Sequence, residues 1–394
     1  MFTKKNLYEN LNLSEKLYIF FTIFLTLFLI LTSSYPNYSE ILSLGYSDSV
    51  SYLCVLSFQC GDFQPILHHA QRWPSHLIVQ LFSKVFGLDV IFSYRFFIFL
   101  LMLVTIKIIQ LIPVSVIKRI AIFSMILFNP YTFRLYFAIP TMISDCLVLV
   151  GFLVFIVGVL NNNLYQILIG VFISIIFKQT GLLLAPFLLI FLYFKYVSFR
   201  TVKWSILLIF LSSAFIIIST KLFFNAIEEN QSANYIELFT GISLSKNIFS
   251  FFLSDSGESF YLIEFLKRYI LALVTLAPLL MVSIKNKQLY LFVFIFFSIH
   301  AQPILAGPMV TGGNIQRLIL VGIPFLIPIF LNVKLSTNKI ILFIAILILG
   351  SFHHNFSIIN SFHYSRELFF VLILVVSLVS LIAFLVQEIK SRVN

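Results

Sequence analysis

The stretch LYIFFTIFLTLFLILT, residues 17–32, carries no charged side chain. A helix that crosses a bilayer needs about 20 mostly apolar residues. Similar runs recur along the whole chain of 394 residues, of which 60% are hydrophobic and 10% charged. An ordinary soluble domain is about 25% charged. The sequence therefore predicts an all-α fold, a polytopic bundle of transmembrane helices.

The residues before this run indicate that it is a retained span and not a cleaved signal peptide. The first fifteen residues are polar and include Lys4, Lys5 and Glu15, and no convincing small-residue cleavage site follows Thr32. Because cytoplasmic ends collect Lys and Arg, we expect the N-terminus to be cytoplasmic. The same rule explains the net charge of +11, so we expect membrane lipids as partners and no nucleic acid.

Alternation of apolar runs with basic turns predicts about 12 spans, with both termini cytoplasmic and residues 1–394 forming one transmembrane domain. Two long segments poor in basic residues, 33–74 and 225–260, are predicted to be outer loops. Besides 17–32, the spans expected at stated positions are 91–112, 141–160, 164–177, 181–197, 204–224, 289–302, 317–332, 340–355 and 368–387.

The three cysteines show no metal-ligand spacing. Cys54 and Cys60 lie in the first outer loop and could form a disulfide if that loop faces an oxidising compartment. The paired histidines of the chain are poor zinc ligands, because adjacent helical residues point about 100° apart.

With this orientation, ionisable and polar side chains gather at the outer ends of the predicted helices. Arginine offers planar bidentate donors to phosphate oxygens, lysine offers a point charge, and a carboxylate can act as a base. We therefore expect Asp48 to be catalytic and the basic residues to bind a substrate phosphate. The full set of candidates is Asp48, His69, Arg72, Arg134, Asp145, Lys178, Asn314, Arg317 and Arg366.

Structural interpretations stand beside these functional ones. Asp48 in YSDS could cap a helix, since Asp and Ser are strong N-caps. Asp145 could cap a helix or pair with Arg134. The arginines could be interfacial anchors whose charged ends reach the headgroups, and Lys178 could lie in the headgroup region. The histidines could be ordinary surface residues.

Read in order, several segments resemble the GT-C superfamily of polytopic glycosyltransferases. They are YSDSVSYL after the first span, QRWPSHLIVQLFSKVFGLDVIFSYRFF, FRLYFAIPTMISDCLVLVGFLVF, IGVFISIIFKQTGLLLAPFLLIF and GGNIQRLILVGIPFLIP. The resemblance covers about residues 15–330. It implies a GT-C-like bundle with an outer active site, a polyprenyl-phosphate-linked sugar as donor, and Asp48 as base or metal ligand. Arg72, Lys178 and Arg317 match the basic positions of the family.

This sequence departs from the family in two places. The first loop lacks the paired acidic residues of some members, which puts a divalent metal (Mg²⁺ or Mn²⁺) at Asp48 in doubt. Lys178 stands where arginine is frequent.

The function we expect is transfer of a sugar to a glycolipid or glycan acceptor during assembly of a cell-envelope polysaccharide, in a bacterial cytoplasmic membrane. Two alternatives stay open: a polysaccharide polymerase of the O-antigen or capsule type, and a flippase or transporter of lipid-linked oligosaccharides. A transporter would place charges or Pro/Gly-broken helices at mid-membrane, whereas the enzyme would gather its charges at one face.

Overall fold

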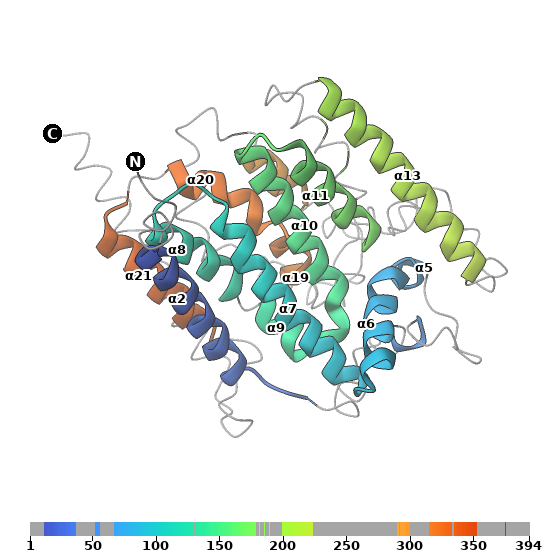
Figure 1. Ribbon diagram of the computed structural model, residues 1–394, viewed down its shortest axis with the longest axis horizontal. Helices are drawn as coiled ribbons and strands as arrows, with labels where there is room; N and C mark the ends of the chain where they lie inside the picture. The colour runs from blue at the N-terminus through green and yellow to red at the C-terminus, as the bar shows by residue number, and fades with distance from the viewer. Residues whose placement is uncertain are drawn as a thin grey trace, which may run out of the picture.

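The computed structural model describes residues 12–36, 52–55, 67–129, 131–178, 199–223, 292–299, 315–332 and 335–352, with the single residues 181, 185, 189, 290 and 375. Within these ranges the fold is all-helical and contains no β-strand (Figure 1). The prediction of an all-α protein is confirmed for this part of the chain.

Four helices are long and apolar enough to cross a membrane: Leu13–Leu31, Val90–Gln110, Pro140–Leu160 and Val202–Thr220. They belong to α2 (Asn12–Leu31), α7 (Val90–Gln110), α10 (Ile143–Leu160) and α13 (Phe199–Phe223). These helices agree with the expected spans 17–32, 91–112, 141–160 and 204–224. The count of about 12 spans and the orientation of the termini stay predictions.

The remaining described helices are shorter. They are α5 (Leu67–Ala70), α6 (Trp73–Phe86), α8 (Val116–Leu127), α9 (Phe133–Ala138), α11 (Leu164–Ile176), α19 (Ile315–Leu320), α20 (Ile327–Asn332) and α21 (Thr337–Gly350), with 3-10 turns at Pro140–Met142 and Ile323–Leu326. Helix α6 begins at Trp73, within the last two residues of the predicted loop 33–74, and continues through a segment for which the sequence predicted no span. Of that loop's residues, 33–36, 52–55 and 67–74 are described, whereas 225–260 lies outside the described residues.

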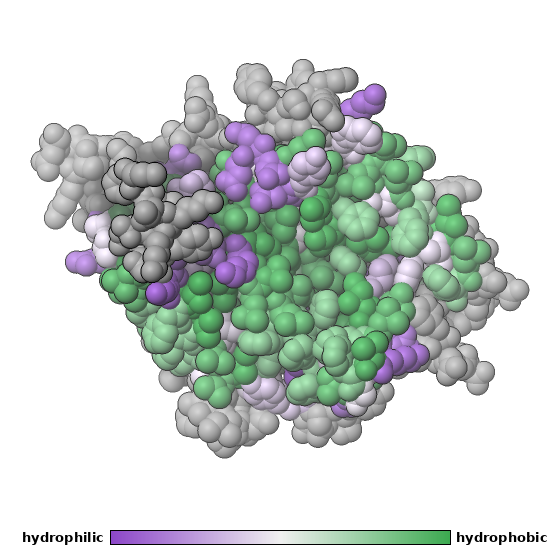
Figure 2. Space-filling view, viewed as in Figure 1, coloured by the Kyte–Doolittle hydropathy of each residue, from purple (hydrophilic) through white to green (hydrophobic). Residues whose placement is uncertain are grey.

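Helix α10 is the centre of the bundle, with α11 beside it and α13 along one edge (Figure 1). In the most apolar window of α10, 89% of the residues are buried, against 28% in α2 and in α13. The outer helices expose large apolar side chains, such as Phe20 on α2 and Phe210 on α13. Figure 2 shows a broad hydrophobic surface across the middle of this face. Exposure of such a surface to water is unfavourable, whereas contact with the hydrocarbon core of a bilayer is not.

Close contact between α10 and α11 depends on glycines. A Cβ added to Gly170 of α11 would lie 2.4 Å from the backbone nitrogen of Phe155, and one added to Gly158 of α10 would lie 2.7 Å from the backbone nitrogen of Ile167. Small residues allow this backbone approach between membrane helices. The antiparallel pair thereby brings the end of α11 to the start of α10.

The expected span 317–332 is not one continuous helix. It is divided into α19, a 3-10 turn and α20, with the interruption at Gly322 and Pro324. Proline lacks the backbone N–H that an α-helix needs and its ring clashes with the preceding turn, so the helix breaks there. Phe325 of the turn packs against Phe152 and Phe155, which lie mid-way along α10.

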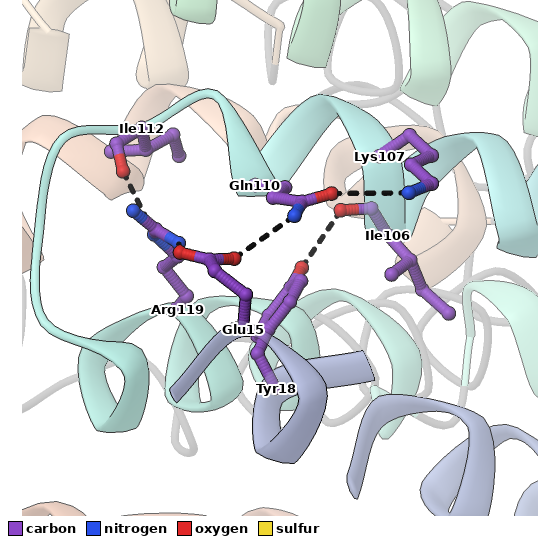
Figure 3. A network of polar contacts seen from close by, with 7 residues as sticks. All are labelled: Glu15, Tyr18, Ile106, Lys107, Gln110, Ile112 and Arg119. Atoms are coloured by element: carbon purple, nitrogen blue, oxygen red, sulfur yellow. Dashed lines mark hydrogen bonds and ion pairs between the residues drawn. The ribbon is translucent and has the colours of Figure 1, made fainter. Parts of the chain in front are cut away.

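At one end of the bundle, polar contacts join the start of α2, the end of α7 and the start of α8 (Figure 3). Glu15 forms an ion pair with Arg119 at 2.6 Å and accepts a hydrogen bond from Gln110 at 2.9 Å. The Tyr18 hydroxyl donates to the Ile106 carbonyl at 2.8 Å. These are the helix ends that the sequence predicts to be cytoplasmic.

The opposite ends also meet. Arg95, near the start of α7, donates to the carbonyls of Pro36, just past α2, and Phe137 in α9. Helices α2 and α7 therefore run antiparallel, as expected for two spans that cross the membrane in opposite directions.

Of the described cysteines, Cys54 is disulfide-bonded and Cys146 is a buried free thiol. The Cys54–Cys60 pairing stays a prediction, because Cys60 lies outside the described residues.

Candidate functional site: a buried cationic cluster

The structure brings four of the nine predicted site residues together, at the helix ends opposite the Glu15 network. We call Arg72, Asp145, Lys178 and Arg317 the cationic cluster. All four are buried, with exposed fractions between 1% and 6%. Asp48, Asn314 and Arg366 lie outside the described residues. Arg134 and His69 are described, and the ion pairs of Asp145 are formed with Lys178 and Arg317.

Asp145 is the centre of the cluster. It lies in the first turn of α10, and its carboxylate holds one cation on each oxygen. Oδ1 pairs with the ammonium group of Lys178, just past the end of α11, and Oδ2 lies 3.2 Å from Nε of Arg317 in α19. The pairing of Asp145 with Arg134 considered from the sequence is therefore wrong: the two cations paired with Asp145 are Lys178, just past α11, and Arg317 of α19.

The start of α6 places Arg72 at the same end. The side chains of Ser75 and Ser144 form a hydrogen bond of 2.7 Å, which joins the start of α6 to the start of α10. Arg72 precedes α6 and lies within electrostatic reach of both Asp145 and Lys178. Its guanidinium donates to the Tyr52 hydroxyl and lies 5.4 Å from the centre of the Tyr52 ring.

Within the described residues, this cluster sets three cations against one carboxylate. Buried cations are stabilised by anionic groups, so three of them at one end of the bundle form a place where an anionic ligand can bind. Two guanidinium groups and one ammonium group are also the donors that phosphate recognition uses. The arrangement can hold a phosphate group and stabilise negative charge that develops on it.

His69, a predicted supporting residue, lies beside Arg72 in an aromatic group. The Tyr52 ring packs against His69 at 4.7 Å and against His76 at 4.9 Å. Nδ1 of His76 and the Tyr94 hydroxyl form a 2.6 Å hydrogen bond. Burial, with Arg72 and His69 nearby, lowers the pKa of His76 to about 3, so the ring is neutral at neutral pH. His69 and His76 are buried, which corrects the surface interpretation for His69.

Arg134, which the sequence predicts to bind phosphate, donates hydrogen bonds to the ends of neighbouring helices, and its role with phosphate stays a prediction. Its side chain is fully buried and donates to the Thr32 carbonyl, to the Thr32 hydroxyl at 3.1 Å and to the Ser351 hydroxyl at 3.3 Å. It thus joins α9 to the ends of α2 and α21. This burial also corrects the interpretation of Arg134 as an interfacial anchor, and the same holds for Arg72 and for Lys178 in the headgroup region.

Sequence reasoning missed Tyr136 of α9 as a site residue. Its side chain is fully buried, and its hydroxyl has no hydrogen-bond partner among the described residues. It lies within electrostatic reach of Asp145 and Arg317. The only sequence signal was its position two residues after Arg134 in a polar segment between apolar runs.

A metal site is not visible in the part of the chain that the structure describes, where no three His, Cys, Asp or Glu residues gather. Asp48 lies outside that part, so a divalent ion at Asp48 stays a prediction. Both oxygens of the Asp145 carboxylate are engaged in ion pairs, with Lys178 and Arg317.

The fold and the site define a class: an all-helical protein with helices of membrane-spanning length and a buried cationic cluster at one end of the bundle. Comparison with known proteins found no match to this chain among protein-family models, curated proteins or solved structures.

Proposed function

We propose that this protein is a membrane glycosyltransferase that uses a polyprenyl-phosphate-linked sugar and transfers it to a glycolipid or glycan at the outer face of a bacterial cytoplasmic membrane. The observation that carries the proposal is the gathering of three buried cationic side chains, two of guanidinium type, around Asp145 at one end of the bundle. An anionic group fits this cluster, and helices long enough to cross a membrane favour an anion attached to a lipid.

In the proposed reaction, an acceptor hydroxyl oxygen attacks the anomeric carbon of the sugar from the face opposite the phosphate. The new carbon–oxygen bond forms as the bond to the phosphate oxygen breaks, so the configuration inverts. The bonding electron pair leaves on the phosphate, and the hydroxyl proton passes to the carboxylate of Asp48. Arg72, Lys178 and Arg317 stabilise the departing phosphate as its charge grows from that of a diester to that of a monoester.

The positions of three charged residues along their helices support an enzyme over a transporter. Asp145 lies in the first turn of α10, Lys107 in the last turn of α7, and Lys221 close to the end of α13. All three residues lie near helix ends and none lies mid-way along its helix, where a transporter would place charges.

A lipid-linked oligosaccharide transporter is the second candidate, because of the interrupted segment 315–332. The interruption at Gly322 and Pro324 adjoins the middle of α10, and broken helices at mid-membrane are typical of secondary transporters. Arg317 precedes the interruption and belongs to the cationic cluster.

Native mass spectrometry of the protein, purified in mild detergent with its bound lipids, tests the proposal. A polyprenyl monophosphate, bare or with one sugar, is the expected result, and the mass would identify the sugar. A polyprenyl pyrophosphate with an oligosaccharide would favour a polymerase or a transporter instead. Ordinary phospholipids alone would contradict the proposal.

A further inference from the structure

We propose that Tyr136 is a binding residue of the cationic cluster, and that its hydroxyl donates a hydrogen bond to an oxygen of the phosphate monoester released from the donor. The inference rests on the function proposed above and adds an uncharged donor to the three cations.

Tyr136 is fully buried, yet its hydroxyl has no hydrogen-bond partner in the part of the chain that the structure describes. A buried polar group without a partner is costly, and buried hydroxyls are therefore nearly always paired. A ligand oxygen that arrives at this place would supply the missing acceptor.

Helix α9 carries both Arg134 and Tyr136. Arg134 fixes one side of this helix to the ends of α2 and α21. Residues two apart on a helix point about 200° apart, so Tyr136 is directed to the opposite side. On that side lie Asp145 and Arg317, both within electrostatic reach of the hydroxyl. Arg134 is thus a positioning residue for Tyr136.

Arg317 of the cluster is also a neighbour of Tyr136. Nε of Arg317 lies toward Asp145, and one terminal guanidinium nitrogen donates to the thioether sulfur of Met142 at 2.8 Å. A thioether is a weak acceptor. A phosphate oxygen is a much better one, so binding of a phosphate beside Met142 would improve the hydrogen bonding of both Arg317 and Tyr136.

The chain offers a matched comparison in Tyr18. Both tyrosines are fully buried, but the Tyr18 hydroxyl donates to the Ile106 carbonyl at 2.8 Å. Tyr18→Phe should lower thermal stability, because it leaves a buried carbonyl without that donor. Tyr136→Phe should leave thermal stability unchanged or raise it, because it removes a hydroxyl that has no partner among the described residues. The two variants remove the same atom, and only Tyr18→Phe is expected to lower thermal stability.

The experiment measures binding of farnesyl phosphate to the full-length protein in detergent, with farnesol as the uncharged control, and the melting temperature of each ligand-free variant. We expect the wild type to bind farnesyl phosphate and not farnesol. Tyr136→Phe should bind farnesyl phosphate about tenfold more weakly or worse, which is the effect of one hydrogen bond to a charged group. Tyr18→Phe should bind like the wild type.

The outcomes separate this inference from the proposed function. Wild-type binding of farnesyl phosphate together with unchanged affinity in Tyr136→Phe would overturn the role of Tyr136 and leave the proposed function standing. A fall in both melting temperature and affinity in Tyr136→Phe would show a structural hydroxyl and would also overturn it. A wild type that binds farnesyl phosphate no better than farnesol would overturn both proposals.

Discussion

The carboxylate of Asp145 and the ammonium group of Lys178 form an ion pair where the end of α11 meets the start of α10, and both side chains are buried. The second oxygen of Asp145 holds Arg317. One carboxylate therefore fixes two cations from distant parts of the chain. In the proposed mechanism Asp145 is a positioning residue: it orients the groups that meet the phosphate.

Replacement of Asp145 by Asn should lower the free energy of unfolding by about 3–5 kcal/mol, because it leaves buried cations without their counter-charge. Thermal unfolding in detergent measures the effect. The double variant Asp145→Asn with Lys178→Met removes one of those cations and should recover part of the stability without recovering phosphate binding. Wild-type stability in the single variant would contradict the importance of the ion pairs.

Substitution of Gly170 by Ala should separate α10 from α11. The added Cβ would lie 2.4 Å from the backbone nitrogen and 2.6 Å from the Cα of Phe155, so the backbone itself must move. We expect a loss of about 1–3 kcal/mol in stability, with weaker phosphate binding as Lys178 shifts from Asp145.

Ile169→Ala is the matched control for Gly170→Ala. Ile169 precedes Gly170 and is 51% exposed, so its truncation should change the melting temperature little. Equal effects of the two substitutions would contradict close packing at Gly170.

Acidification should destabilise the protein through His76, whose pKa is lowered from 6.5 to about 3 by burial. The unfolded chain binds a proton at this residue below pH 6.5 and the folded protein does not. The contribution of His76 to the free energy of unfolding is thus fully present above pH 6.5 and is lost as the pH falls toward 3. Between pH 7.5 and 5 the loss is about 2 kcal/mol.

His76→Phe should remove this part of the pH dependence. The measurement is the difference in unfolding free energy between pH 7.5 and 5, for the wild type and for the variant. A variant that retains the wild-type difference would show that other groups cause it.

Asp48→Asn should slow sugar transfer by about 10²–10⁴-fold while the protein still folds and inserts. A general base contributes about 10²–10⁴-fold to a rate, and transfer of label from a polyprenyl-phosphate sugar to the acceptor measures it. Asp62→Asn, in the same predicted loop, is the control and should retain activity. Full activity in Asp48→Asn would contradict the assignment of the base.

The sequence predicted the helical class and several helix positions well, because these depend on local hydropathy. The expected span 91–112 is α7, residues 90–110, and the expected span 141–160 is α10, residues 143–160. The interruption of 317–332 was missed, although Gly322 and Pro324 were visible. Proline in a membrane helix can cause a kink or a break, and packing against neighbours decides between the two.

For the site, the sequence identified Arg72, Asp145, Lys178 and Arg317 as candidates from residue type and from their expected position at the outer ends of helices. It did not separate them from Arg134, which has the same residue type as two of them and a similar expected position. Which arginine meets Asp145 depends on the rotation of α9 about its axis. That rotation is set by contacts with Thr32 and Ser351, both far from Arg134 in the chain.

The sequence alone thus determined that this protein is helical, apolar and built from segments of membrane-spanning length, since burial of apolar side chains and internal backbone hydrogen bonding follow from local composition. Only the tertiary structure decided that Lys178 and Arg317 share the Asp145 carboxylate, that Arg134 joins helices and that the Tyr136 hydroxyl has no partner in the described part of the chain. These relationships depend on which helix faces meet, and close packing between residues far apart in the chain fixes those faces.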